Sequence, residues 1–157
     1  MATNESSFKK EFRNALEKHY GVRAAVWTNN DMFRCGLPDL SAHYQGKFFP
    51  MEAKYVKEPP VRPSSKVLGH ELTDVQAGFL YRIQKTGGYG VVLIGFADIA
   101  VAVPFSEWSF RNEVPDTNIT LERVRLLGGK NLHFPKRNGI WAVEFFFERI
   151  MACATSS

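Results

Sequence analysis

The apolar positions near the start of the chain predict a helix over residues 7–20. They recur at helical spacing and form one stripe, made of Phe8, Phe12, Ala15, Leu16 and His19. At the angular spacing of an α-helix, Glu11 lies at the border of this stripe, whereas Glu17 points away from it. The helix is therefore expected to bury its stripe and to hold Glu11 beside the core.

A β-hairpin is predicted by two segments, 39–44 and 48–54, which a turn signal separates. Successive side chains of a strand point to opposite faces, so Glu52 and Lys54 share one face of the second strand. Charged side chains are rarely buried unless they are paired or bind a metal. Two charges on one face of an otherwise apolar strand therefore indicate more than simple packing.

A second helix is predicted to begin after Thr73 and to end at residues 86–88. Thr73 and Gln76 fit a capping box, and the Thr-Gly-Gly sequence at the end is a C-cap signal. The apolar positions expected to face inward are Val75, Phe79 and Ile83.

Apolar runs at 89–95 and 98–103 predict two further strands, the first of them buried on both faces. Residues 105–112 fit a short helix, and residues 120–127 fit either a helix or a strand. The order of helix, three strands, helix and two strands predicts an α/β fold, with a mixed β-sheet flanked by helices.

The C-terminal third predicts an extra β-hairpin around Asn138-Gly139, a strong turn sequence. Its second arm, 140–148, is aromatic on both faces, so it is expected to be covered on both sides or to lie in an interface. We therefore divide the chain into a core over 1–112 and an extension over 113–157. The extension is expected to pack on the core, as a DNA-binding or dimerisation element.

Composition narrows the class of protein. The chain has 157 residues, of which 45% are hydrophobic, enough for one folded domain with a full core. Its start is polar, no run approaches about twenty apolar residues, and neither a membrane span nor a signal peptide is expected. Two cysteines, Cys35 and Cys153, make no disulfide framework or zinc spacing, which fits an intracellular, cytoplasmic protein. The net charge of +4 modestly favours an anionic partner.

Three side chains of the first hairpin form a set that can cut a phosphodiester. Asp39 and Glu52 are oxygen ligands of the kind that Mg²⁺ prefers, and the Ala53 carbonyl can join them. Lys54 can orient the attacking water and stabilise developing negative charge. A Glu-x-Lys pair by itself is usually a solvated ion pair, and the Gly-Leu-Pro-Asp sequence at 36–39 is what favours the metal interpretation.

Four features occur in a fixed order along the chain. They are a helix with a glutamate, Gly-x-Pro-Asp at 36–39, Glu-x-Lys at 52–54 and a helix that opens with a glutamine. This set resembles the PD-(D/E)XK nuclease superfamily, and most closely its VRR-NUC and Holliday-junction-resolvase-like branch. The resemblance covers roughly residues 8–96 and implies a restriction-endonuclease-like core. It also implies a magnesium-dependent DNA endonuclease in which Mn²⁺ substitutes for Mg²⁺.

The resemblance also implies roles for single residues. Asp39, Glu52 and Ala53 bind the metal, and Lys54 takes part in catalysis. Gln76 lies close to the lysine and the scissile phosphate, although a helix cap alone would also explain it. A first-helix glutamate reaches the metal, a role assigned to Glu11. For Glu11 a surface pair with a lysine is an equal alternative, and Glu5 near the chain end is a weaker candidate for the role.

Two groups of basic residues are candidates for contacts with DNA phosphates. Lys57, Arg62 and Lys66 lie on the long segment 55–71, which is expected to be a mobile loop beside the catalytic lysine. The second group surrounds the C-terminal hairpin and comprises Lys130, Lys136 and Arg137. For both groups, ordinary solvated charges are an equal alternative.

The leading hypothesis is a DNA endonuclease, and two substrates compete within it. Branched DNA suits a small resolvase-like enzyme, whereas a homing or restriction-type enzyme would use residues 113–157 to recognise sequence. Either enzyme cuts two strands, so a homodimer is expected, with residues 140–147 as its candidate interface. The alternatives of another class are a non-catalytic nucleic-acid-binding module and an unrelated α/β binding protein. Solitary nuclease cores are common in phages and mobile elements, which leaves such an origin open.

Overall fold

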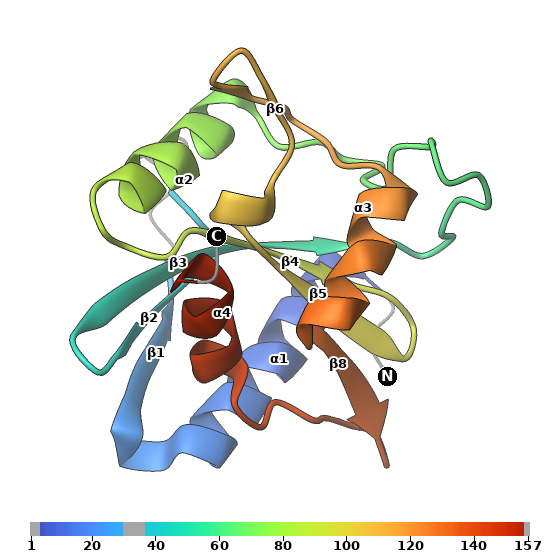
Figure 1. Ribbon diagram of the computed structural model, residues 1–157. Coiled ribbons are helices and arrows are strands. Elements are labelled where there is room, and N and C mark those ends of the chain that lie inside the picture. Colours follow the sequence, from blue (N-terminus) through green and yellow to red (C-terminus); the bar gives the residue numbers. More distant parts are fainter. Residues whose placement is uncertain (1–3, 30–36, 156–157) are drawn as a thin grey trace.

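The computed structural model describes residues 4–29 and 37–155, and these residues form an α/β fold (Figure 1). Gly36 and Cys35 lie outside the described residues. The helices are α1 (Glu5–Tyr20), α2 (Asp74–Lys85), α3 (Leu121–Leu126) and α4 (Phe146–Thr155). The strands are β1 (Ala24–Thr28), β2 (Leu40–Tyr44), β3 (Lys47–Tyr55), β4 (Val91–Gly95), β5 (Ile99–Pro104), β6 (Phe110–Arg111), β7 (Val114–Pro115), β8 (His133–Arg137) and β9 (Ile140–Trp141).

Within the described residues, one mixed sheet has seven strands in the order β1-β2-β3-β4-β5-β8-β9. The first three strands form an antiparallel meander, and β3 pairs in parallel with β4 through the crossover that contains α2. The next two neighbours, β5 and β8, are antiparallel. The predicted mixed sheet with flanking helices is therefore confirmed, and β3 lies near its centre.

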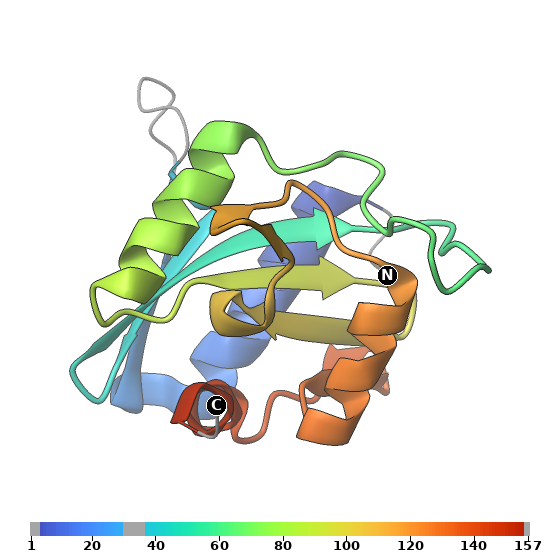
Figure 2. The ribbon, with the colours of Figure 1, turned by 45° about the horizontal axis from the view of Figure 1, so that its top comes forward.

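Helices cover both faces of this sheet. On one face, Tyr55 of β3 contacts Phe8 of α1, and Phe49 of β3 contacts Phe147 of α4. On the other face, Glu52 of β3 accepts a hydrogen bond from Gln76 of α2. Figure 2 shows α1 and α2 on opposite sides of the sheet. The even-numbered side chains of β3 therefore face α2, away from the core that α1 and α4 cover.

Helix α2 presents a different side to the sheet than its apolar residues predicted. Ala77 and Leu80 are buried, whereas Val75 is exposed. Phe79 and Ile83 are half-buried, and the side of the helix that carries Gln76 faces β3, where Gln76 donates to Glu52. In α1, the last buried residue of the apolar stripe is Tyr20, whereas the sequence pattern predicted its neighbour His19.

The C-terminal hairpin is present, but its second arm is short. Asn138 and Gly139 have positive φ and join β8 to β9. After Trp141 the chain leaves the sheet, and Phe145, with a φ of 61°, turns it into α4. Phe146 and Phe147 are fully buried against α1 and β3. The two-sided aromatic pattern therefore reflects a core helix, and these two rings are not available to a dimer interface.

The structure decides the segment 120–127, which was left open, and corrects the short helix predicted for 105–112. Residues 120–127 contain the helix α3, which Thr120 caps by accepting a hydrogen bond from the backbone of Arg123. Phe105–Glu107 is a single 3₁₀ turn that leads into the small hairpin of β6 and β7.

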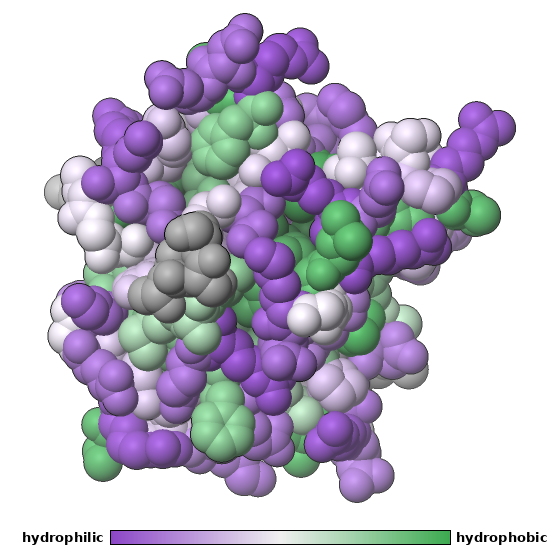
Figure 3. Space-filling view, viewed as in Figure 1, coloured by the Kyte–Doolittle hydropathy of each residue, from purple (hydrophilic) through white to green (hydrophobic). Residues whose placement is uncertain are grey.

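The surface carries its hydrophobic side chains in separate patches among hydrophilic ones, as the face in Figure 3 shows. Across the described part of the chain, no helix combines the length and the apolar character needed to cross a membrane.

Candidate active site

Asp39 and Glu52 lie side by side on neighbouring strands. Asp39 immediately precedes Leu40, which pairs with Met51, so Asp39 stands opposite Glu52. The Asp39 carboxylate accepts a hydrogen bond from the Ala53 backbone N–H at 3.1 Å, which fixes it against β3. Lys9 of α1 lies 3.7 Å from the other oxygen of Asp39. The hairpin predicted from sequence alternation therefore brings the two predicted carboxylates together.

Glu52 is buried and incompletely satisfied. Glu52 is only 3% exposed, and its Oε1 accepts a hydrogen bond from Gln76 Nε2 at 3.1 Å. The second oxygen, Oε2, is buried, and no hydrogen-bond donor among the described residues reaches it. Burial raises the pKa of Glu52 well above its ordinary value, and the charge of Asp39 and a hydrogen bond between the two carboxyl groups, which needs a proton, raise it further.

Lys54 follows Glu52 on the same face of β3 and is only 8% exposed. Its positive charge acts on Glu52 and partly offsets the effect of burial on the pKa of that carboxyl. A buried lysine beside two carboxylates is costly for a protein to hold without a function, because burying charge is unfavourable. The three residues predicted for the chemistry therefore form one cluster.

Gln76 forms the predicted helix cap, and its side chain also reaches the predicted site. Its side-chain oxygen accepts a hydrogen bond from the Thr73 backbone N–H at 2.9 Å and completes the capping box. Its amide nitrogen donates to Glu52. The cap therefore orients the side chain that holds one carboxylate oxygen of the site.

Glu11 does not join this cluster. It lies 2.7 Å from Lys136 of β8, so its carboxylate is paired at the opposite side of α1. Glu5 is the α1 carboxylate whose charge raises the pKa of Glu52. Successive residues of a helix are 100° apart, so Glu5 shares a side of α1 with Lys9, which contacts Asp39. The prediction for Glu11 is corrected because sequence spacing cannot tell which border of a stripe meets β2 and which meets β8.

The donor set fits a hard divalent cation. Within residues 4–29 and 37–155, no three histidine, cysteine, aspartate or glutamate side chains come together as a complete metal cage. Mg²⁺ needs no such cage, because it keeps several waters and takes one or two carboxylates. The unpartnered Oε2 of Glu52, next to Asp39, is the kind of oxygen that such a cation would satisfy.

The loop after Lys54 is anchored at its second half, which corrects the expectation of a mobile loop. The backbone N–H groups of Val67 and Leu72 donate to Ile119 and Thr117, each at 2.9 Å. Asn118, only 4% exposed, bonds Leu68 through both atoms of its side-chain amide. Local sequence patterns could not indicate this role of Asn118, because its partner Leu68 lies fifty residues away in the chain.

The two predicted groups of DNA-binding residues differ in availability. Lys57, Arg62 and Lys66 are all exposed on the loop that follows Lys54. In the other group, Lys130 pairs with Glu107 at 2.8 Å, and Lys136 pairs with Glu11. The strand β8 that carries Lys136 is three positions from β3 in the sheet. The C-terminal group, of which Arg137 alone is not in a described ion pair, therefore lies apart from the carboxylates.

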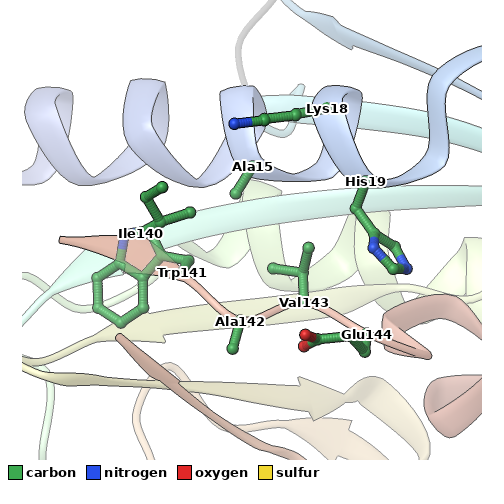
Figure 4. A pocket seen from close by; sticks show the side chains of 8 residues that line it. All are labelled: Ala15, Lys18, His19, Ile140, Trp141, Ala142, Val143 and Glu144. Atoms are coloured by element: carbon green, nitrogen blue, oxygen red, sulfur yellow. The ribbon is translucent and has the colours of Figure 1, made fainter. Parts of the chain in front are cut away.

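The hollow drawn in Figure 4 also lies apart from the carboxylates. It has a volume of about 350 Å³ and lies between α1 and residues 140–144. Its lining comprises Ala15, Lys18, His19, Ile140, Trp141, Ala142, Val143 and Glu144. None of these residues belongs to the predicted site, so this hollow and the predicted site are separate.

Comparison with known proteins shows the fold. The chain is similar to Hjc, a Holliday junction resolvase from the archaeal hyperthermophile Archaeoglobus fulgidus, with a TM-score of 0.51. The match covers 74% of this chain and 92% of the resolvase chain, at 13% sequence identity. No family model and no curated protein sequence matches the chain. The protein thus has a resolvase-like, restriction-endonuclease-like α/β fold.

Proposed function

We propose that this protein is a metal-dependent DNA endonuclease of the PD-(D/E)XK type, acting on branched DNA. One observation carries the proposal, namely the buried Asp39–Glu52 pair with an unpartnered carboxylate oxygen and Lys54 on the same face. The likeness of the fold to a Holliday junction resolvase supports the same class of reaction. An inert scaffold gains nothing from keeping these three charges together in a buried place.

Each residue has a role in this proposal. Asp39 and Glu52, with the Ala53 carbonyl, hold a divalent cation, and Glu5 replaces Glu11 as the nearby carboxylate of α1. When bound, Mg²⁺ supplies an acidified water and charge neutralisation at the phosphate. Lys54 orients the nucleophile and stabilises the negative charge that develops on the phosphate.

The protonation state of Glu52 links its burial to metal binding. Because burial and Asp39 raise its pKa, Glu52 keeps its proton more readily than an exposed carboxyl does. A carboxyl must be ionised to ligate a cation, so loading the site releases this proton. Gln76 holds Oε1 in place, which leaves Oε2 as the oxygen that would ligate the cation.

Basic side chains of the protein near the end of β3 offer a surface on which the DNA backbone can bind. Lys57 and Lys66, with His70, line a hollow of about 310 Å³ at the end of β3. Phosphate contacts of this kind position a strand and do not read its sequence. They suit an enzyme that recognises the shape of a branch point, and cutting two strands makes a homodimer the economical assembly.

Cleavage of an end-labelled four-way junction tests the proposal, beside linear duplexes with the same arm sequences, in Mg²⁺ and in EDTA. Paired cuts at the junction in Mg²⁺ alone are the expected result. Lys54→Ala should remove cleavage and keep binding, and Lys47→Ala, an exposed lysine at the other end of β3, is the matched control. Cleavage at the wild-type rate by Lys54→Ala, or cleavage in EDTA, would overturn the assignment. Binding without any cleavage by the wild-type protein would instead favour a non-catalytic module.

A further inference from the structure

Three aromatic rings form a cluster on the face of the first three strands. They are Trp27 of β1, His43 of β2 and Phe48 of β3. The Trp27 and His43 ring centroids are 5.8 Å apart with planes within 13°, and His43 and Phe48 are 5.4 Å apart with planes within 28°. Trp27 and His43 are exposed, and Phe48 is half-buried. Figure 1 shows β1 at the edge of the sheet, where nothing in the described chain pairs with its outer side.

The register of the sheet places this cluster on the same face as the carboxylates. Trp27 is paired with Ser41, and Ser41 is paired with Pro50. Asp39 and Glu52 lie two residues further along these same strands, and residues two apart in a strand share a face. Two residues along a strand span about 7 Å, so Trp27 lies about that far from the two carboxylates, measured along the strands. The ring cluster therefore borders the predicted site.

A hydrogen-bond chain ties Trp27 to the motif that carries Asp39. The Trp27 indole N–H donates to Asn29 at 3.1 Å. The Asn29 side-chain amide donates in turn to the Pro38 carbonyl and to Ser41, each at 2.8 Å. The Asn29 backbone N–H donates to the Asp39 carbonyl at 2.9 Å. The ring is therefore held in a set orientation relative to the carboxylate, although it is partly open to solvent.

We propose that this aromatic cluster of Trp27, His43 and Phe48 is a stacking site for an unpaired nucleobase next to the scissile phosphate. Stacking on an aromatic face is tolerant of sequence, because every base has a π-face, and it requires a base that has left the duplex. Such bases occur where strands branch. The inference rests on the proposed nuclease function and adds to it a recognition element for unpaired DNA.

The alternative occupant, a second copy of this chain, fits the surface less well. A stable protein interface buries about 800 Å² on each partner. Among the described residues of β1, Trp27 is the one large exposed hydrophobic side chain, and its neighbours on that face are the small Ala25 and the polar His43. Three near-parallel rings offer the area of a base and little more.

A thermodynamic cycle tests the stacking site directly. The cycle uses the Lys54→Ala variant, which should bind DNA without cutting it. In this variant, Trp27 is changed to Ala or to Phe. Each protein is titrated with a splayed duplex whose unpaired arms carry thymines, and with the same duplex whose arms are abasic. The two DNAs have the same backbone charge and differ only in the bases available for stacking.

With Trp27 present, we expect the protein to bind the DNA with thymine arms about tenfold more tightly than the DNA with abasic arms. Trp27→Ala should bind the two DNAs equally. Trp27→Phe should restore most of the preference for thymine arms, because it restores a ring. Phe145→Ala, which removes an exposed ring outside the cluster, is the matched control and should keep the preference. Circular dichroism should show the same unfolding midpoint for the controls and for Trp27→Ala.

Three outcomes would overturn the stacking site. They are a preference that survives in Trp27→Ala, an equal loss of affinity for both DNAs, and dissociation of a dimer by Trp27→Ala in sedimentation. Junction cleavage by the wild-type protein is measured in parallel. If the junction is cut and the cycle shows no coupling, the stacking site alone fails. If the wild-type protein neither cuts nor binds any DNA, the proposed function fails.

Discussion

The β2–β3 hairpin and the β8–β9 hairpin both carry charged side chains that are shielded from solvent, but the charges have different partners. In the β8–β9 hairpin, Lys136 meets Glu11 at 2.7 Å and lies over the Trp141 ring, so its charge is satisfied within the protein. In the β2–β3 hairpin, Glu52 keeps an unpartnered buried oxygen and its pKa is raised. A satisfied ion pair stabilises a fold, whereas a buried carboxyl oxygen without a donor can be satisfied by a bound cation. This contrast supports the proposed site in the β2–β3 hairpin.

The largest expected difference between the hairpins is in activity. Lys54→Ala should lower the rate of junction cleavage by at least about 100-fold, because it removes charge stabilisation of the transition state. Lys136→Ala removes an equally buried lysine from the other hairpin and should change the rate by less than about twofold at a temperature where both proteins are folded. Single-turnover cleavage measures both rates. Equal losses in the two variants would erase the distinction between the hairpins.

The second difference is in the sign of a stability change. Without metal, Glu52→Gln should raise the free energy of unfolding at neutral pH by about 1–3 kcal/mol, because Glu52 must take up a proton on folding and an amide need not. Glu11→Gln should lower it, because Lys136 then keeps its charge without a carboxylate partner. Urea unfolding in EDTA measures both. Destabilisation by Glu52→Gln under these conditions would mean that the site is structural.

The pH dependence of stability sharpens the same point. The pKa of Glu52 is raised in the folded protein, so between its ordinary and its raised value the unfolded chain is ionised while the folded one keeps the proton. The stability contribution of Glu52 is therefore complete at acidic pH and is lost as pH rises through the folded-state pKa. The slope contributed by this one group is at most about 1.4 kcal/mol per pH unit.

Glu52→Gln should remove that slope, and unfolding curves between mildly acidic and mildly basic pH, in EDTA, measure it. Saturating Mg²⁺ should also flatten the slope in the wild-type protein, because the cation stabilises the ionised form. A slope in EDTA that is the same with and without Glu52 would show that other groups produce it.

The smallest expected difference is in DNA binding. Lys57→Ala and Lys66→Ala should each weaken binding to any DNA and lower the steepness of its salt dependence by about one counterion. Lys130→Ala should change neither, because this lysine pairs with Glu107 and lies away from the carboxylates. Fluorescence anisotropy at several salt concentrations measures these slopes. A loss of slope for Lys130→Ala as large as for Lys57→Ala would mean that DNA also contacts the turn before β8.

Much of the fold followed from local signals. The alternation at 39–44 and 48–54, the capping box of Thr73 and Gln76, and the Asn138-Gly139 turn were all read correctly from sequence. Each of these signals acts over a few residues, so it needs no knowledge of the partner that packs against it. The fate of residues 145–155 was missed because an aromatic run fits a buried helix as well as a strand.

The sequence by itself determined that Asp39, Glu52 and Lys54 share a hairpin, because strand alternation and a turn leave them no other arrangement. Only the tertiary structure decided which carboxylate of α1 lies near them, Glu5 and not Glu11, since that depends on which strands flank the helix. It also decided that Asn118 anchors the loop after Lys54, and that Trp27 lies on the face of the carboxylates. These relations depend on contacts between segments far apart in the chain, which local patterns do not specify.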